Sequence, residues 1–377
     1  SSLLDIVKSD ALRDAEHLRK VAAAATTTLS QSICAALLRS FHSSNPGGQP
    51  RSEEAQRQLM FFCNSLRFTS LKTPTPLQQV KSWTPFTPYY AEDVKYRIDE
   101  LTTPLEDEKT LFSLIVATFQ HDFDNFKERI RALGTDDDVV LREHWAEAQT
   151  WASDRTQSLS RCVRGVTLYG SALRLLARLE GYDDATAETL VRSKFEFLVS
   201  AQIFGKQRQA PSGSMDKFKA DAIEELIKDH ADLKVCFVHV PKDTTTEDFA
   251  SCLIGRDEET DDLKIDFKVK LPGNPIIGEG KPENQNQAVI FARGAYLQTL
   301  DMNQDNYMGE SYKMRNLLDC FHGDVVLVGF PETIFSETHG AVAQFAAISE
   351  FIFQTFQRFM TWPLMVRFHY GHPDVWD

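Results

Sequence analysis

An α/β fold is the class that this sequence predicts, and three observations point to it. From about residue 195 onward, short β-prone segments alternate with helical ones. The residues before about 180 are mostly helical by hydrophobic period. The chain has 377 residues, 42% of them hydrophobic and 25% charged, which is a globular composition with enough length for a large core. Strands that alternate with helices, with Gly and Asp in the turns, are typical of sheets that bind nucleotides.

The first half of the chain is predicted to be mainly helical. The hydrophobic period of 3.6 residues predicts helices over 3–42, 52–67, 92–101, 108–132 and 139–180, the last broken near Trp151. The Pro, Gly and Ser residues of SNPGGQPRS, at 44–52, predict a linker between the first two helices.

One aromatic segment in this half is predicted to be a strand. TPFTPYY, residues 84–90, is short and β-prone. Proline cannot donate to a strand ladder, so Pro85 and Pro88 predict that the segment is a strand start or an edge strand.

The second half is predicted to form the sheet. Its apolar runs predict strands at 195–204, 235–240, 263–271, 288–294, 296–301 and 325–331, with helices near 214–230, 305–321 and 338–360. We therefore expect an N-terminal helical segment with its linker over 1–50, a mainly helical part over 51–190, and an α/β part over 191–377.

Bulk composition excludes several classes of protein. The net charge of −13 argues against nonspecific nucleic-acid binding, and it means that any anionic ligand must be held by local cations. Six cysteines occur without a CxxC pair or zinc-like spacing, which favours a reducing compartment over a disulfide framework. No run of about 18 apolar residues is long enough to predict a membrane span.

Polar side chains are concentrated in GEGKPENQNQAVIFARG, residues 278–294. Lys281 supplies one charge, and residues 284–287 (Asn284, Gln285, Asn286, Gln287) supply four consecutive amides, which suit sugars and uracil. Further on, DMNQDNY places Asp301 and Asp305 after a predicted strand, where open α/β sheets hold ligands. Two polar hairpin loops would explain the same residues.

The aspartates of DMNQDNY do not have the spacing of a shared metal site. Three residues separate Asp301 from Asp305, unlike the DxD spacing with which two carboxylates share one divalent cation. Mg²⁺ or another divalent cation is therefore the weaker way to neutralise a phosphate here. Lys281 could do so without a metal.

Two further clusters carry charges at helix starts. WASDRTQSLSRCVRG, residues 151–165, places Arg155, Arg161 and Arg164 on a predicted helix, and guanidinium groups suit phosphates. Pairing with an acidic surface is the alternative. Glu92 and Asp93 follow TPYY, either as ligand-facing groups or as carboxylates that stabilise a helix N-terminus.

The end of the chain invites a metal interpretation that the spacing does not favour. HYGHPDVW contains His369, His372 and Asp374, but two histidines around a Pro-containing segment are more typical of a turn. The sequence has no GxSxG, Walker or GxGxxG motif, so serine hydrolases, P-loop NTPases and dinucleotide enzymes lack support.

Seven segments, taken together, resemble one family: the 1,3-β-glucan synthases of glycosyltransferase family 48, called callose synthases in plants. They lie in the family's order across residues 53–377 and read RQLMFFCNSL, TPYYAEDV, WASDRTQSLSRCVRG, KFEFLVSAQIFGKQ, KLPGNPIIGEGKPENQNQAVIFARG, LDMNQDNYMGESYKMRNLL and VRFHYGHPDVWD. The resemblance implies a GT-A-like mixed sheet flanked by helices. It also implies transfer of glucose from UDP-glucose to a 1,3-β-glucan acceptor, at the cytoplasmic face of the plasma membrane and together with the rest of a membrane-embedded synthase.

The resemblance also implies roles for particular residues. Lys281 and Asn284 would hold the diphosphate or the sugar, Asp301 would lie at the donor site, and Glu92 would contact the nucleotide end. A second set is assigned to donor binding or to structure: Asn286, Arg293, Asp305, Arg155 and Arg161.

The chain departs from the family pattern in several places. Gln287 stands where the family has His, Ala295 stands where an acidic residue commonly follows Arg-Gly, and IFSETHGAV at 334–342 is closer to fungal members. In the family, an Asn-Glu-Asp motif and a Gly-Lys-Gly-Arg-Asp motif follow HYGHPD, and neither occurs within this chain. We therefore expect the catalytic base to lie beyond Asp377, and this chain to bind donor but polymerise poorly.

A noncatalytic role is the alternative from a different class. The same sheet would then bind partner proteins within the synthase complex. The helical residues 1–180 would dock onto a small GTPase regulator or a neighbouring subunit.

Overall fold

The computed structural model describes most of residues 75–328 and parts of 344–355. Short gaps fall at 91, 107, 133, 242–247, 258, 276–280, 303 and 329–343. The chain divides into two compact units, Ser1–Asp319 and Cys320–Asp377. The helices expected at 3–42 and 52–67, and the HYGHPDVW segment, lie outside the described residues.

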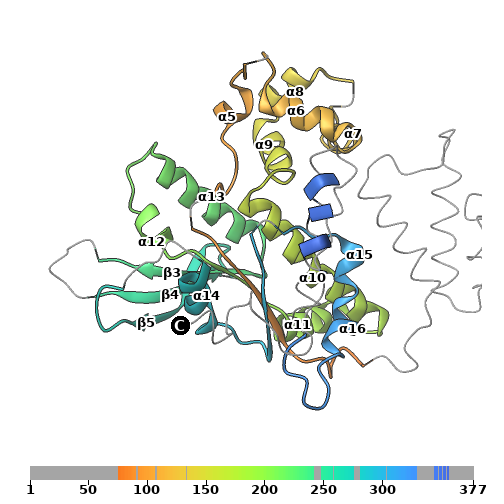
Figure 1. Cartoon of the computed structure of the whole chain (residues 1–377), viewed down its shortest axis with the longest axis vertical. Coiled ribbons are helices and arrows are strands. Elements are labelled where there is room, and N and C mark those ends of the chain that lie inside the picture. The colour runs from red at the N-terminus through yellow and green to blue at the C-terminus, as the bar shows by residue number, and fades with distance from the viewer. Residues whose placement is uncertain are drawn as a thin grey trace, which may run out of the picture. The chain divides into compact units, whose positions relative to one another are not determined.

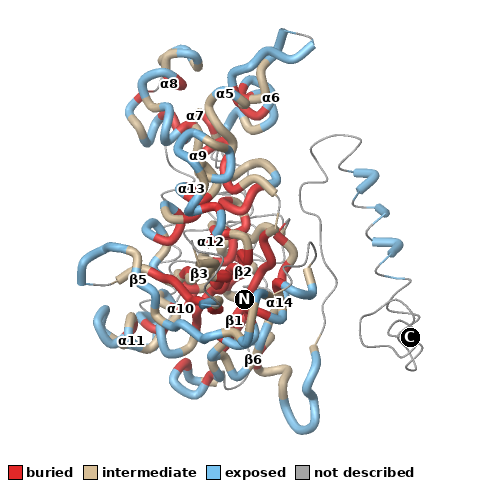
Figure 2. The backbone as a smooth tube through the Cα atoms, turned by 90° about the vertical axis from the view of Figure 1, so that its left-hand side faces the viewer, coloured by how far each residue is buried: buried red, intermediate tan, exposed pale blue. Residues whose placement is uncertain are grey.

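A mixed six-stranded sheet forms the centre of the first unit, as the α/β prediction requires (Figure 1). In the order β5-β4-β3-β2-β1-β6, its strands are Leu263–Lys270, Ala250–Arg256, Leu233–His239, Phe197–Ser200, Trp83–Pro88 and Tyr296–Thr299. The neighbours β3, β2, β1 and β6 run parallel, while β4 and β5 add to β3 in antiparallel pairs. The residues of β1 and β2 are all buried, whereas β5 and β6 are largely exposed or half-buried (Figure 2).

Helices cover both faces of the sheet. On one face, α10 (Leu159–Leu179), α11 (Asp184–Lys194) and α13 (Met215–Asp229) bury their apolar residues against alternate strand residues such as Phe197 and Val235. On the other face, α14 (Lys281–Val289) lies against β1, β2 and β3. Strand residues of the opposite parity, such as Phe86 and Leu198, meet Ala288 and Phe291 there. This period of two is what a strand buried on both faces requires.

The helices on the larger face begin at residues that suit helix starts. Ser158, Asp183 and Ser214 each accept a hydrogen bond from the third backbone N–H of the helix that follows. Short helices complete this unit: α12 (Phe204–Gln207), α15 (Met308–Ser311) and α16 (Met314–Leu318).

A second hydrophobic cluster is built by helices alone. It comprises α5 (Ile98–Thr102), α6 (Leu111–Thr118), α7 (Gln120–Arg129), α8 (Asp137–Glu143) and α9 (Trp145–Ser153), which lie together in Figure 1. Phe112, Phe123 and Trp151 pack with edge-on and tilted rings at its centre. Such aromatic contacts add to the stability that burial of the rings provides.

The strand TPFTPYY is not at an edge, contrary to the prediction from its prolines. β1 lies between β2 and β6. Its pairing with β6 covers Trp83–Phe86, and its pairing with β2 covers Phe86–Pro88. Backbone bonds to β6 involve Ser82 and Phe86, and a bond to β2 involves Tyr89, so even-numbered residues face β6 and odd-numbered residues face β2. Pro85 faces β2 between the isolated Trp83–Phe195 bridge and the start of the β2 ladder, and Pro88 faces β6 after the β6 ladder ends, so neither proline removes a donor that a ladder uses.

Other sequence-based boundaries also differ from the structure. The strand predicted at 288–294 is wrong, because its first residues belong to α14. β4 and α11 were not predicted, and residues 325–328 do not form a strand. The helix over 305–321 is two short helices, the one at 92–101 begins only at Ile98, and 139–180 divides into α8, α9 and α10.

No helix in the part of the chain that the structure describes is both long and apolar enough to cross a membrane.

Candidate functional site

The edge of the sheet where the parallel strands end brings together four of the polar residues singled out from the sequence: Glu92, Lys281, Asn284 and Asp301. We call it the carboxyl edge and define it by the ends of β1, β2 and β6. Asp301 follows β6, Tyr90 and Glu92 follow β1, and Gln202 follows β2. Helix α14 begins at this edge and runs back along the sheet, since its first turn contacts the residues after β2 and the turn that follows the helix contacts the start of β1. Ligands of open α/β sheets bind at this edge.

Lys281 and Asp301 form an ion pair at the carboxyl edge. The distance from Lys281 Nζ to Asp301 Oδ2 is 2.5 Å, and 43% and 38% of the two side chains are exposed. Exposed pairs of this kind contribute at most about 1 kcal/mol, because water screens them. An anionic ligand can therefore take over Lys281 at little cost.

Asn284 joins the start of α14 to the end of β2. Its side chain is 1% exposed, and its Oδ1 accepts a hydrogen bond from the backbone N–H of Gln202 at 3.2 Å. Gln202 in turn donates from Nε2 to the carbonyl of Glu283 at 3.4 Å. These bonds hold the first turn of α14, with Lys281, against the carboxyl edge.

Tyr90 connects Glu92 with the charges of Lys281 and Asp301. Its Oε2 accepts a hydrogen bond from the backbone N–H of Tyr90 at 3.3 Å. Burial and the carboxylate of Glu92 raise the pKa of the Tyr90 phenol, and Lys281 opposes them. Tyr90 therefore lies within the field of both charges. No helix starts at Glu92, since α5 begins only at Ile98, so a helix-capping role is excluded.

A second group of charges lies beside the carboxyl edge at the start of α10. The Asp305 carboxylate lies 3.1 Å from Arg164 Nη2 and 3.4 Å from Arg161 Nε. Arg164 also lies 3.9 Å from Asp154. Arg161 and Arg164 therefore pair with carboxylates, which is the alternative to phosphate binding that the sequence left open.

Gly165 allows the Asp305 loop to approach α10 closely. A Cβ at this position would lie 2.8 Å from the backbone N of Asn306 and 3.0 Å from Asp305 Oδ1. Asn306 also donates from Nδ2 to the Gly165 carbonyl at 3.2 Å. The glycine is needed because the loop backbone occupies the space of a side chain.

The remaining candidates are placed elsewhere or make other contacts. Arg155 stacks on the Trp151 ring at 4.4 Å and donates to the Trp151 carbonyl. Arg293 lies at the opposite edge of the sheet, paired with Glu196 at 2.5 Å. Asn286 is exposed on α14, whereas Gln287 is buried and donates to Ser251 on β4.

Two residues of the carboxyl edge were not singled out from the sequence. Tyr90 was within a quoted motif, TPYY, but only the structure places its phenol near Lys281 and Glu92. Gln202 lay inside a segment predicted to be a strand as far as 204. A polar residue directly after an apolar strand is the signal that could have identified it.

The chemistry available at the carboxyl edge is that of polar recognition. A lysine, two carboxylates, a phenol and a buried amide can hold a polar anionic molecule by hydrogen bonds and charge. In the regions that the structure describes, no group of three or more His, Cys, Asp and Glu side chains could hold a metal ion.

These features define the class of protein: an α/β domain in which the parallel strands end at an edge lined by polar and charged side chains, where open α/β sheets bind ligands. A family model described as "1,3-beta-glucan synthase component" matches residues 139–377. The chain belongs to this 1,3-beta-glucan synthase family.

Curated relatives agree with the family model. The chain is 38% identical over 362 residues to callose synthase 10 of Arabidopsis thaliana, 38% identical over 355 residues to callose synthase 9, and 36% identical over 379 residues to callose synthase 3 of the same plant. Each match covers 87% of this chain but only 18 to 19% of the relative. The chain thus spans about a fifth of the length of these relatives.

Proposed function

We propose that this chain forms the donor-binding part of a 1,3-β-glucan synthase, which transfers glucose from UDP-glucose to a growing 1,3-β-glucan. One observation carries the proposal: Glu92, Asp301 and the pair Lys281 and Asn284, which belong to three separate motifs, meet at the carboxyl edge. Family membership supplies the reaction class. By the same reasoning, the whole synthase works at the cytoplasmic face of the plasma membrane.

The proposed roles follow from the chemistry of each group. Lys281 neutralises the diphosphate, and the start of α14 directs its N–H groups toward the same charge. Asp301 accepts hydrogen bonds from glucose hydroxyls, while Glu92 and Tyr90 contact the nucleotide end. Asn284 is a positioning residue, because its buried amide holds the α14 turn that carries Lys281.

The stereochemistry sets the form of the reaction. UDP-glucose is an α-linked donor and the product is β-linked, so the acceptor 3-hydroxyl attacks in line and inverts the anomeric carbon. A carboxylate takes the proton of that hydroxyl as the new bond forms. Positive charge at the carboxyl edge stabilises the UDP that leaves.

Calorimetric titration of the 377-residue chain with UDP-glucose and with UDP tests the proposal. We expect the Lys281→Ala variant to bind both ligands about tenfold more weakly, because a charge-assisted hydrogen bond is lost. The matched control is Lys268→Ala, since Lys268 is also an exposed lysine paired with an aspartate, Asp248, but lies on β5. Equal affinities in the wild type and Lys281→Ala would remove Lys281 from the site. Absence of any nucleotide-sugar binding would favour the noncatalytic role in which partner proteins bind.

Metal dependence is tested by the same titration with excess EDTA and then with Mg²⁺. Because Lys281 can supply the charge that a cation would supply, we expect donor affinity to persist in EDTA. Strict dependence on a divalent cation would contradict this arrangement.

A further inference from the structure

The segment that follows β1 carries Tyr90 and Glu92 and leaves the sheet at the carboxyl edge. Its first anchor is the backbone N–H of Tyr89, which donates to the carbonyl of Ser200, the last residue of β2, at 2.8 Å. Its next anchor is the Asp93 carbonyl, which accepts a hydrogen bond at 2.9 Å from the backbone N–H of the first residue of α10. Glu92 lies between these two anchors, so the ladder of the sheet does not fix its position.

Lys219, on α13, holds the backbone of Glu92 between the two anchors. Its Nζ donates to the Glu92 carbonyl at 3.0 Å and lies 3.6 Å from Asp93 Oδ1. The Lys219 side chain is 14% exposed, whereas that of Asp93 is 40% exposed. The shorter contact is therefore the one to the main chain. A bond to a carbonyl restrains the path of the backbone, and with it the point from which the Glu92 side chain projects.

The helix that carries Lys219 is itself well supported. α13 buries Ile223 and Leu226 in the main hydrophobic core, against the sheet. Further along the same helix, Glu225 pairs with Lys95 at 2.9 Å, and the Lys95 side chain is 2% exposed. α13 thus contacts the segment after β1 at two points. The ammonium group of Lys219 therefore projects from an element that the core fixes, which is the arrangement that places a functional group accurately.

Lys219 also brings positive charge to a turn that is rich in carboxylates. Burial raises the pKa of the Tyr89 phenol, and the charges of Glu92, Asp93 and Asp216 raise it as well. The three carboxylates therefore lie around one phenol, and their like charges repel one another. The ammonium group of Lys219 offsets that repulsion while it holds Glu92 from the main-chain side.

We propose that Lys219 is a positioning residue of the donor site, whose bond to the Glu92 carbonyl places the Glu92 carboxylate and Tyr90 against the nucleotide of the donor. Tyr90 is included because its backbone N–H donates to Glu92 Oε2 at 3.3 Å, so a displacement of Glu92 also releases Tyr90. Lys219 acts through Glu92 and not on the ligand itself. The inference rests on the proposed function, since Glu92 has this role only if a nucleotide binds at the carboxyl edge.

Calorimetric titration of the 377-residue chain with UDP and with UDP-glucose tests this role. We expect Lys219→Met to bind both ligands about tenfold more weakly, and by the same factor, because both carry the nucleotide. Lys219→Arg should stay within about threefold of the wild type, since a guanidinium can donate to the same carbonyl. The matched control is Lys217→Met. Lys217 lies on the same helix and pairs with Asp221 at 2.6 Å, so its loss removes the same charge but no bond to Glu92. Unchanged affinity in Lys219→Met, or an equal loss in Lys217→Met, overturns the proposal.

A double-mutant cycle with Glu92→Ala separates positioning from a general structural role. If Lys219 acts through Glu92, Lys219→Met should weaken UDP binding by less than about threefold in the Glu92→Ala background. A full tenfold loss in that background would show that Lys219 acts elsewhere, and it overturns the proposal. Should Lys219→Met not fold, Lys219→Gln replaces it in the same cycle.

Failure of the donor site is visible separately in the same titrations. Weaker UDP binding in Lys281→Ala together with unchanged binding in Lys219→Met overturns this inference and leaves the donor site in place. Absence of UDP binding by the wild type removes both.

Discussion

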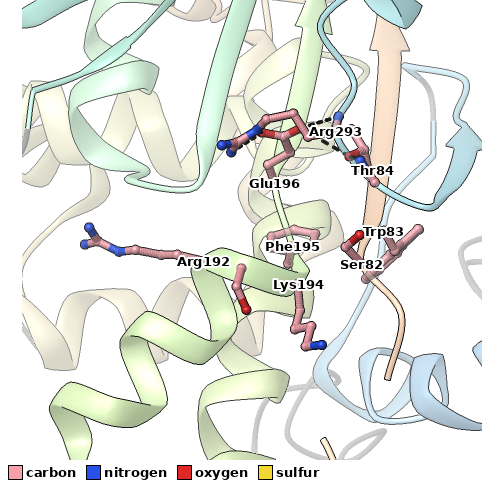
Figure 3. A pocket seen from close by; sticks show the side chains of 10 residues that line it. Ser82, Trp83, Thr84, Arg192, Lys194, Phe195, Glu196 and Arg293 are labelled. Atoms are coloured by element: carbon pink, nitrogen blue, oxygen red, sulfur yellow. Dashed lines mark hydrogen bonds and ion pairs between the residues drawn. The ribbon is translucent and has the colours of Figure 1, made fainter. Parts of the chain in front are cut away.

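The two edges of the parallel strands hold their charges in different ways. At the carboxyl edge, the Lys281–Asp301 pair is exposed by 43% and 38%. At the amino edge, where the parallel strands begin, the Glu196 carboxylate is 6% exposed and accepts four hydrogen bonds (Figure 3). The first pair is screened by water on both sides, whereas removing Arg293, itself 57% exposed, would leave the Glu196 carboxylate buried without a counter-charge.

This difference separates the edge where we propose that a ligand binds from an edge where a buried carboxylate stabilises the fold. Arg293 follows α14, so the Glu196–Arg293 pair fixes the far end of the helix whose first turn carries Lys281. The buried Glu196–Arg293 pair at the amino edge thereby positions the helix that carries the exposed Lys281–Asp301 pair at the carboxyl edge. Functional groups held on well-supported elements are placed more accurately than groups on unsupported loops.

The largest expected effect is the loss of the buried carboxylate. We expect Glu196→Ala to lower the free energy of unfolding by about 2 kcal/mol, because the buried Thr84 hydroxyl and the Arg293 backbone N–H lose their acceptor, whereas the exposed Arg293 guanidinium can be solvated. Asp301→Ala, the matched change at the carboxyl edge, should cost less than about 1 kcal/mol. Urea unfolding of both variants at one pH measures the contrast. Should Glu196→Ala not fold, Glu196→Gln keeps the shape and is expected to lie between it and the wild type. Similar losses for Glu196→Ala and Asp301→Ala would remove the distinction between the edges.

The next effect distinguishes two roles of Asp301. Asp301→Asn removes the charge that competes for Lys281 and weakens any bond to the sugar hydroxyls. We expect affinity for UDP-glucose to fall about tenfold while affinity for UDP stays equal or rises. Calorimetry with both ligands gives the comparison. A parallel loss for UDP and UDP-glucose would show that Asp301 does not contact the sugar.

A smaller effect is expected from the close approach at Gly165. Alanine favours a helix interior by about 1 kcal/mol over glycine, but a Cβ here meets the loop of Asp305 and Asn306. Displacing that loop costs more, so we expect Gly165→Ala to be destabilising by about 1 kcal/mol in net effect. Gly273→Ala is the control, since a Cβ there meets nothing within 4 Å. Thermal unfolding of the two variants checks this, and a gain in stability for Gly165→Ala would show that the loop adjusts freely.

The smallest effect concerns pH at the amino edge. Arg174 pairs with Glu188 at 2.6 Å and with Asp232, the residue before β3, at 2.9 Å. The hydrogen bonds from Arg174 lower the pKa of Glu188 from 4.5 to about 2. The carboxylate thus stabilises the fold above pH 4.5, and this contribution is lost as the pH falls toward 2.

Glu188→Gln tests that pH dependence. Because Glu188 is a third exposed, we expect a loss below about 1 kcal/mol at neutral pH. The difference in the free energy of unfolding between the variant and the wild type should shrink as the pH falls from 4.5 to 2. Urea unfolding at several pH values across that range measures it. A constant difference would mean that Glu188 acts through packing and not through its charge.

Much of the sheet could be predicted from local patterns. The strands β2, β5 and β6 and the helix α13 lie within the segments expected from apolar periodicity, and β3 overlaps most of the strand expected at 235–240. The segment 288–294 was misassigned because Ala288, Val289, Ile290 and Phe291 form an apolar run. In the structure only Ala288 and Phe291 face the sheet, at helical spacing, while Val289 and Ile290 are about half exposed.

The place of β1 could not be predicted because it depends on where two ladders begin and end. Its prolines correctly indicate missing donors, but Pro88 faces β6 beyond the end of that ladder, and Pro85 faces β2 between an isolated bridge and the start of the ladder. Likewise, Arg293 belonged to the motif that carries Lys281, and only the structure places it at the far edge with Glu196, a residue 97 positions away.

The sequence by itself determined the fold class, the family and the residues with suitable chemistry, because period, motif order and side-chain type are local properties of the chain. Tertiary structure alone decided which of those residues meet. Parallel strands from distant segments bring Glu92, Lys281 and Asp301 to one edge, and the direction of α14 carries Arg293 to the other. Strand order and helix direction are set by burial over the whole sheet, so no single segment encodes them.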